Sequence, residues 1–167
     1  ITVTVHNRAS LETVLEMGIE AGFFFKGETG LSRYGFREDE WAPALEAYRA
    51  SGRHNCRGVY THFGAGMREE LDASLDRFDR FLAAADASIP HPFVTMAASS
   101  HTATQRPSLP YGAVDPGRFL YGMLPASETG GLLSEPVVTA GQSRLLQVST
   151  AREEQDVRVG YGDLLRL

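Results

Sequence analysis

The sequence predicts an α/β protein: part of a (β/α)8 TIM-type barrel, followed by the beginning of a β-domain. Short β-rich segments alternate with amphipathic helical segments through residues 1–125, and this alternation produces parallel strands joined by helical crossovers. A complete barrel needs about 250 residues, whereas this chain has 167. We therefore expect the later strand-helix units of a barrel, with the first strands upstream of Ile1. A doubly wound open sheet is the alternative.

The first predicted unit begins with a strand at residues 1–6, where β-branched side chains alternate with Thr. Asn7 and Ser10 are residue types that cap helix N-termini. Apolar side chains then recur at helical spacing, at Leu11, Val14, Leu15 and Ile19. A second strand, Phe-Phe-Phe-Lys, is expected at residues 23–26.

A glycine-rich polar loop follows this second strand at residues 27–36. Lys26, at the carboxyl end of the strand, is the only lysine in the chain. Glycines let the backbone turn sharply or approach a ligand, and Glu28 and Arg33 add charge to the same loop. Loops of this kind on a rigid scaffold often carry function, so we expect a site at this end of the strand.

Two more units and a fifth strand complete the predicted barrel portion. A helix is expected from Glu38 to Gly52, a strand at residues 57–63 and another strand at residues 93–98. Between those strands an apolar helical stripe is formed by Met67, Leu71, Leu75, Phe78, Phe81, Leu82 and Ala85. Residues 118–122, which read Arg-Phe-Leu-Tyr-Gly, are the candidate for the fifth strand.

The alternation stops after Pro125. Residues 136–148 read as β-structure without an intervening helix. We interpret residues 126–134 as a linker and residues 135–167 as the start of a C-terminal β-domain.

Composition and charge narrow the classes of partner. The net charge of -5 without any basic block argues against a nucleic-acid surface or an anionic membrane as the main partner. The single cysteine, Cys56, excludes an intrachain disulfide framework and suits a reducing compartment. With no apolar run long enough for a membrane span, we expect a cytoplasmic protein that binds a small molecule.

Several side chains that could bind a ligand or take part in chemistry follow the predicted strands. Both barrels and open parallel sheets have their ligand sites at these positions. The residues concerned are Lys26, Arg33, His62, Ser99, His101, Asp115 and Gly117. The loops at Ser99 and Gly117 can present backbone N–H groups and a hydroxyl to a phosphate. Taken singly, His62 can equally be a structural histidine, and Ser99 can equally be a helix cap.

Two other motifs are weaker. Gly64-Ala65-Gly66 lacks the third glycine of a dinucleotide-binding fingerprint, because Glu69 stands in its place. His62 and His101 do not form a local cluster with metal-ligand spacing. We therefore expect neither a dinucleotide nor a metal site.

Several segments resemble motifs of the alanine racemase family. Residues 26–36 resemble its lysine-acid-Thr-Gly-Met-x-Arg-x-Gly motif, and Thr61-His62-Phe63 resembles its Thr-His-Phe strand end. Residues 96–100, 114–122 and 159–162 resemble its Ala-Asn-Ser-Ala segment, its Val-Arg-Pro-Gly-x-x-Leu-Tyr-Gly segment and the entry to its β-domain. The resemblance implies a pyridoxal-phosphate enzyme with a barrel, a β-domain and an active site shared between the two subunits of a homodimer.

The resemblance also implies roles for individual residues. Arg33 would lie beside the phenolic oxygen of pyridoxal phosphate, with Lys26 supporting it as the free amine or as a carbamate. His62 would stack on the pyridine ring or flank it. The phosphate would be held by Ser99 and by the backbone at Gly117 and Arg118.

Three departures from the family pattern qualify the implied activity. The lysine that forms the family's Schiff base lies on the first barrel strand, which this chain does not contain, so no catalytic residue is certain here. The second base of the family is a tyrosine, and its place falls on Leu164 or Leu165. Asp115 replaces the arginine that faces the pyridine nitrogen.

The Asp115 replacement changes the chemistry that the resemblance implies. A carboxylate favours a protonated ring nitrogen and therefore a fuller electron sink than an arginine does. We expect a racemase that interconverts L- and D-amino acids by α-proton abstraction from a Schiff base. The alternatives are altered chemistry, as in a decarboxylase, aldolase or dehydratase, and an inactive homologue in which Asp115 pairs with Arg118 or caps a turn.

Overall fold

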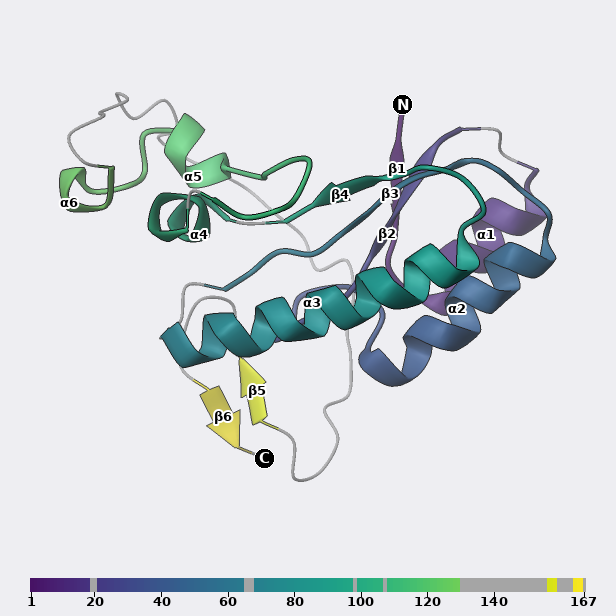
Figure 1. Cartoon of the computed structure of the whole chain (residues 1–167), viewed down its shortest axis with the longest axis horizontal. Coiled ribbons are helices and arrows are strands. Elements are labelled where there is room, and N and C mark those ends of the chain that lie inside the picture. Colours follow the sequence, from purple (N-terminus) through teal and green to yellow (C-terminus); the bar gives the residue numbers. More distant parts are fainter. Residues whose placement is uncertain are drawn as a thin grey trace.

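A computed structural model describes residues 1–18, 21–64, 68–97, 99–106, 108–129, 156–158 and 164–166. Four parallel strands form one sheet in the order β1-β2-β3-β4 (Figure 1). They are β1 (Val3–Val5), β2 (Phe23–Lys26), β3 (Cys56–Tyr60) and β4 (Val94–Met96). The strand order follows the chain order, as in a barrel wall. β2 has the predicted bounds, whereas β1, β3 and β4 are shorter than the predicted ranges 1–6, 57–63 and 93–98.

Three amphipathic helices gather on one side of this sheet: α1 (Arg8–Glu16), α2 (Glu38–Ala50) and α3 (Arg68–Ser88) (Figure 1). The Asn7 side chain caps α1 by accepting from the Ser10 N–H at 2.8 Å, as the sequence predicts. Pro43 lies beyond the first turn of α2, where its missing N–H costs a helical bond.

Successive side chains along each strand point to opposite faces of the sheet, one towards the helices and the other towards the barrel interior. The side chains of β2 and β3 that face the helices are fully buried and form an aromatic core with residues of α2 and α3. Its largest fully buried members are Phe23, Phe25, Phe36, Tyr48, Phe63, Phe78 and Phe81. The opposite face of the sheet carries Thr4, Phe24, Tyr60 and Met96, which line an open cavity of about 420 Å³.

The later part of the barrel portion differs from the prediction at one element. The predicted strand at residues 118–122 is wrong, since Gly117–Leu120 form the short helix α5. Strand-like pairing occurs earlier, where Ala113 bridges to Met96. A short apolar run cannot distinguish strand from helix by periodicity alone.

Two other short helices complete this region: α4 (Ser100–Gln105) and α6 (Ala126–Thr129). α6 falls inside the range expected to be linker. Further on, β5 (Asp156–Arg158) pairs antiparallel with β6 (Leu164–Arg166), so both leucines at the family's tyrosine position lie in β6. The β-structure predicted at residues 136–148, the 64–66 glycine motif except Gly64, and the motif at residues 159–162 lie outside the described residues.

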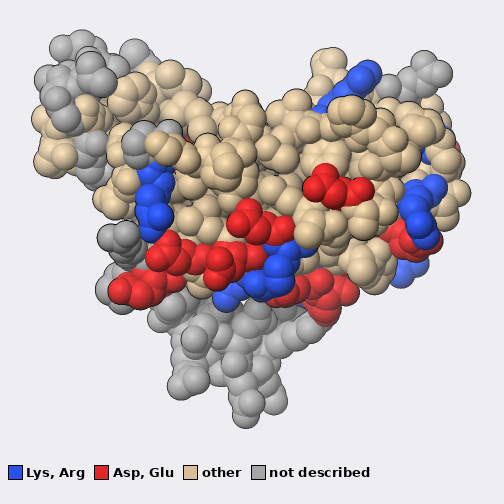
Figure 2. Space-filling model, viewed as in Figure 1, with Lys and Arg blue, Asp and Glu red and all other residues tan. Residues whose placement is uncertain are grey.

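The charged side chains on the outer face of α3 form a mixed rather than a single-sign surface. Figure 2 shows acidic and basic groups interleaved there. Arg80 pairs with Glu38 at 2.9 Å, and Arg106 pairs with Asp72 at 2.6 Å. Within the ranges that the structure describes, no helix combines the length and apolar character needed to cross a membrane.

Candidate active site

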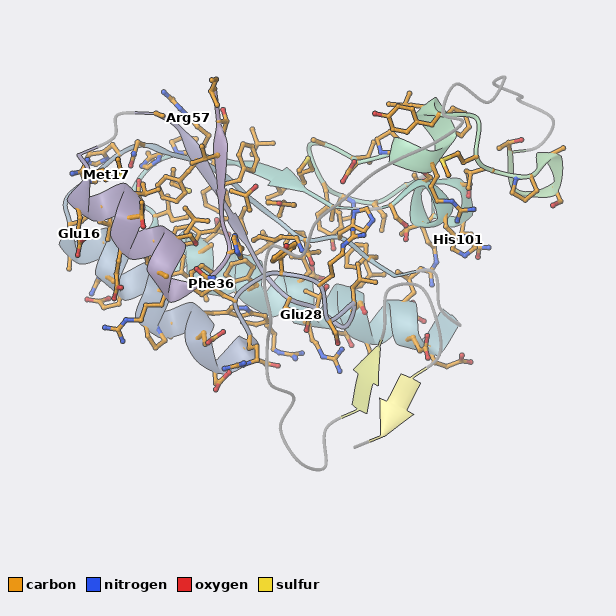
Figure 3. All side chains as sticks on the ribbon, turned by 180° about the vertical axis from the view of Figure 1, so that it is seen from behind. Glu16, Met17, Glu28, Phe36, Arg57 and His101 are labelled. Atoms are coloured by element: carbon orange, nitrogen blue, oxygen red, sulfur yellow. The ribbon has the colours of Figure 1, made fainter. Side chains whose placement is uncertain are left out.

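Two adjoining cavities lie at the carboxyl ends of the parallel strands. The larger, of about 470 Å³, is lined by Thr4, His6, Lys26, Arg33, Tyr34, Tyr60, His62 and Asp115. The smaller, of about 270 Å³, is lined by Arg33, His62, Ser99, Ser100, His101, Asp115, Gly117, Arg118 and Tyr121. Figure 3 shows His101 on α4, on the opposite side of the molecule from Glu16 at the end of α1.

Every predicted site residue lines one of these cavities. Arg33, His62 and Asp115 line both, so these three residues form the boundary between the two spaces. The parallel sheet explains this convergence, because residues that follow neighbouring strands meet at the same edge. Among the described residues, no group of three or more His, Cys, Asp or Glu side chains is placed to hold a metal ion.

Lys26 enters the larger cavity from the end of β2 and is buried. Its Nζ atom donates to the backbone oxygens of Arg33 at 2.6 Å and of Tyr34 at 2.9 Å, and lies 5.8 Å from the centre of the Tyr60 ring. Burial, helped by the nearby positive charge of Arg33, lowers the pKa of Lys26 to about 8.

His62 and Asp115 are in close contact across the boundary of the cavities. His62 Nδ1 lies 3.2 Å from Asp115 Oδ2, with the histidine buried and the aspartate half exposed. Burial lowers the pKa of His62 below its usual value, as does the charge of Arg33, while Asp115 raises it. Burial and the cations therefore favour a neutral imidazole, and the carboxylate of Asp115 opposes this by favouring the protonated form.

The smaller cavity contains the loops predicted to bind phosphate. The Ser99 hydroxyl caps α4, accepting from the Thr102 N–H at 3.4 Å, so the structural role considered for Ser99 is present. The Ser100 hydroxyl accepts from the Phe119 N–H at 2.9 Å, which ties α5 to α4. Arg118 donates to the backbone oxygen of Met123 at 3.2 Å, and the space beside Gly117 is open.

Four further residues line the larger cavity although the sequence did not single them out as site residues: Thr4, His6, Tyr34 and Tyr60. The rings of His6 and Tyr34 meet edge to face at 4.9 Å, and the hydroxyls of Thr4 and Tyr60 lie 3.0 Å apart. His6 follows β1 directly. The other candidate site residues were selected because they follow a predicted strand. The same rule, applied to the first strand, would have selected His6.

Comparisons with known proteins place this arrangement in a family. Residues 1–125 match the family model described as "Alanine racemase, N-terminal domain". Alanine racemase from Salinispora tropica is 32% identical over 173 residues, covering 97% of this chain and 45% of that protein. Alanine racemase from Thermobifida fusca is 29% identical over 150 residues, covering 85% of this chain and 39% of that protein. The chain thus spans about two fifths of the length of these curated relatives.

Solved structures agree. Alanine racemase from D-cycloserine-producing Streptomyces lavendulae superposes with a TM-score of 0.68 at 28% identity, covering 78% of this chain and 37% of that chain. The enzyme from Corynebacterium glutamicum gives a TM-score of 0.65 at 27% identity, covering 73% and 36%. These matches confirm the predicted partial barrel, because the N-terminal domain of the family is a TIM barrel. The chain belongs to the alanine racemase family, whose members depend on pyridoxal phosphate.

Proposed function

We propose that the protein acts as a pyridoxal-phosphate amino-acid racemase of the alanine racemase type, and that this chain supplies much of its cofactor-binding shell. One observation carries the proposal: Arg33, His62 and Asp115 converge on the boundary between two cavities whose other walls hold Lys26, Ser99, Gly117 and Arg118. Resemblance in the motifs alone would not require these residues to meet.

The residues fit the cofactor in charge and shape. Lys26, Arg33 and Arg118 outnumber Asp115 at the cavity walls, which suits an anionic ligand. The open space beside Gly117 and the hydroxyls of α4 suit the phosphate end. The larger cavity, bounded by the rings of Tyr34, Tyr60 and His62, suits the aromatic ring.

The proposed role of each residue follows from its position in the two cavities. When bound, the cofactor withdraws electrons from the α-carbon of the attached amino acid. Arg33 would neutralise negative charge on the phenolic oxygen, and the neutral ring of His62 would bound the pyridine. Asp115 would lie against His62 and face the ring nitrogen. The proton-transferring lysine and tyrosine of the family have no counterpart assigned in this chain.

Asp115 supports a second candidate. Its carboxylate pairs with His62, so an anion stands where the family pattern has an arginine. Such an anion favours a protonated ring nitrogen, and decarboxylation, aldol cleavage or β-elimination then compete with racemisation. The contact with His62 also gives Asp115 a partner other than Arg118, which was the pairing considered for an inactive homologue.

We also propose the domain boundaries, the substrate class, the oligomeric state and the cellular location. We assign residues 1–125 to the barrel portion, residues 126–134 to a linker and residues 135–167 to the start of the β-domain. The family match that ends at residue 125 supports the first boundary. An amino-acid substrate, a homodimer that completes the site and a cytoplasmic location follow from the family resemblance and from the single cysteine.

A spectroscopic titration tests cofactor binding. Pyridoxal phosphate is added to the full-length protein and to the 167-residue chain. We expect an absorbance band at roughly 420 nm from lysine-bound cofactor in the full-length protein alone. Arg33→Leu should weaken binding, whereas Arg49→Leu, at an exposed position on α2, should not. A band in the short chain that disappears in Lys26→Met would make Lys26 the covalent anchor and contradict its supporting role.

Product analysis then separates the two chemistries. Incubation of the full-length protein with L-alanine should give D-alanine if it is a racemase. Release of carbon dioxide or ammonia from a panel of amino acids would instead support the second candidate. Asp115→Arg should then shift the products towards racemisation, and no change in product ratio would show that Asp115 does not direct the chemistry.

A further inference from the structure

Two buried threonine hydroxyls link the loop after β2 to the strand end that carries His62. Thr29 Oγ1 and Thr61 Oγ1 lie 2.8 Å apart, and Thr61 Oγ1 donates to the backbone oxygen of Gly27 at 2.9 Å. Both threonines are almost fully buried, at 1% and 2% exposed. We propose that Thr61, assisted by Thr29, is a positioning residue that holds His62 at the boundary of the two site cavities.

Thr61 lies on the opposite face of the extended chain from His62. Side chains continue to alternate after β3 as they do within it. Val59 and Phe63 belong to the core, whereas Tyr60 and His62, which lie between them, line the larger cavity. Thr61 shares the direction of Val59 and Phe63, and it lines neither of the two site cavities. It can therefore affect a ligand only through the backbone that it shares with His62.

The number of hydroxyl protons fixes the order of donors along this link. A threonine hydroxyl has one proton to donate and two lone pairs with which to accept. Because the Thr61 proton is directed to Gly27 O, the bond between the two hydroxyls requires the Thr29 proton. The chain of bonds therefore runs from Thr29 through Thr61 to Gly27 O, and Thr61 is its central member.

Thr61 also joins the ends of three neighbouring strands. Its N–H donates to Met96 O at the end of β4, at 3.2 Å, and its hydroxyl reaches Gly27, which follows β2. Gly27 N donates in turn to Tyr60 O, at the end of β3, at 2.9 Å. These bonds fix the position of the next residue, His62, relative to β2 and β4.

Helix α3 holds the other end of the link. Arg77 Nη1 donates to Thr29 O at 3.0 Å. The loop also packs closely against this helix, because a Cβ at Gly30 would lie 3.0 Å from Ser74 Oγ and 3.1 Å from Arg77 Nη1. Loss of the hydroxyl link should therefore loosen the strand end at His62 more than the loop at Thr29.

Unfolding equilibria test the order of the bonds. In the full-length protein, Thr61→Val should lower the ratio of folded to unfolded protein at least about fivefold, because it leaves Gly27 O and the Thr29 proton buried without partners. Thr29→Val removes one bond and should lower the ratio less. The double variant should be no less stable than Thr61→Val alone, since Thr29 then has no proton to satisfy. Losses that multiply in the double variant would contradict the link.

Histidine proton NMR tests positioning without any ligand. Burial and the cations Arg33 and Lys26 lower the pKa of His62, and burial is the largest cause. Asp115 opposes them by raising it. Loosening of the strand end exposes the imidazole to water, so Thr61→Val should raise the pKa of His62 towards its usual 6.5. Thr61→Ser keeps the hydroxyl and should titrate like the wild type.

A matched control separates positioning from loss of stability. Tyr48→Phe also removes a buried hydroxyl bond, to the Cys56 N–H, but it lies in the core beside α2. It should destabilise the protein without changing the pKa of His62. Equal His62 titrations in Thr61→Val and the wild type would overturn the proposal, as would equal shifts in Thr61→Val and Tyr48→Phe. If Thr61→Val does not fold, the milder Thr29→Val decides by the same comparison.

Binding of pyridoxal phosphate tests the consequence for the site and rests on the proposed function. Thr61→Val should weaken binding at least about fivefold, the equivalent of one lost hydrogen bond, whereas Thr61→Ser and Tyr48→Phe should bind like the wild type. Unchanged affinity in Thr61→Val would contradict the proposal. If the wild-type protein does not bind the cofactor, the proposed function is wrong, while the titration of His62 still decides whether Thr61 positions it.

Discussion

Asp115 Oδ2 lies 3.2 Å from Nδ1 of the buried His62, so a carboxylate from the segment before α5 meets a histidine from the end of β3. The pair stands against Arg33 in both cavities. The charge state of His62 is therefore set by burial and by charged neighbours of both signs, since Arg33 and Lys26 lower its pKa and Asp115 raises it. The balance can be shifted by changing one neighbour at a time.

Asp115→Asn should lower the pKa of His62 further below its usual 6.5, since it removes the raising influence. Histidine proton NMR across pH 4–8 measures the shift. When the pKa of a group is lower in the folded than in the unfolded protein, the free energy of unfolding decreases as the pH falls from the unfolded-state pKa to the folded-state pKa. The variant should therefore lose more stability than the wild type below about pH 6.5. An unchanged His62 pKa would mean that the pair does not persist in solution.

Lys26 should make stability rise with pH. Its pKa is lowered from 10.5 to about 8 in the folded chain, so the unfolded state holds the extra proton between these values. Relative to Lys26→Met, the free energy of unfolding should increase by about 3 kcal/mol from pH 8 to pH 10.5. Urea unfolding of both variants at several pH values measures this difference. A flat difference would show that Lys26 titrates normally.

Gly35 should tolerate no side chain. Its φ is +123°, and a Cβ there would lie 2.6 Å from Glu28 N and 2.7 Å from Gly27 C. Gly35→Ala should cost at least about 3 kcal/mol through backbone strain and overlap with backbone atoms. Gly52, with φ +65° and open space around it, is the control, and Gly52→Ala should cost about 1–2 kcal/mol. Equal losses in urea unfolding would rule out the overlap.

Tyr48 links α2 to the start of β3 inside the core. Its hydroxyl accepts from the Cys56 N–H at 2.9 Å. Tyr48→Phe should cost about 1–3 kcal/mol, because it leaves that buried N–H without an acceptor. Tyr111→Phe, which removes an exposed bond to Asp79, should cost under about 1 kcal/mol. Thermal unfolding compares the two, and a smaller loss for Tyr48 would contradict the buried bond.

Local patterns were sufficient for most of the fold. Alternation of β-rich and amphipathic segments predicted four parallel strands and three long helices, because strand and helix periodicities are properties of short segments. The same patterns failed at residues 118–122, where a short apolar run forms α5. Its backbone is held by contacts with α4, including the bond from Phe119 N to Ser100 Oγ, and no local pattern contains that contact.

The candidate site was predictable in part. The rule that ligand residues follow parallel strands selected Lys26, Arg33, His62, Ser99, His101, Asp115 and Gly117, and the motif resemblance added Arg118. The rule was not applied to His6, although that residue also follows a strand. Tyr34 and Tyr60 carried no signal, since cavity walls depend on which side chains converge in space.

Sequence alone therefore determined the order of the four parallel strands and the three long helices, the family and the residues that stand at the strand ends, because each depends on short-range pattern. The tertiary structure decided which side chains contact one another. It paired Asp115 with His62 rather than with Arg118, its neighbour in the chain, and directed the only lysine onto the backbone of the Arg33 turn. The physical reason is that a hydrogen bond or ion pair depends on distances between atoms, and those distances are set only when the parallel strands align and their following loops meet at one edge.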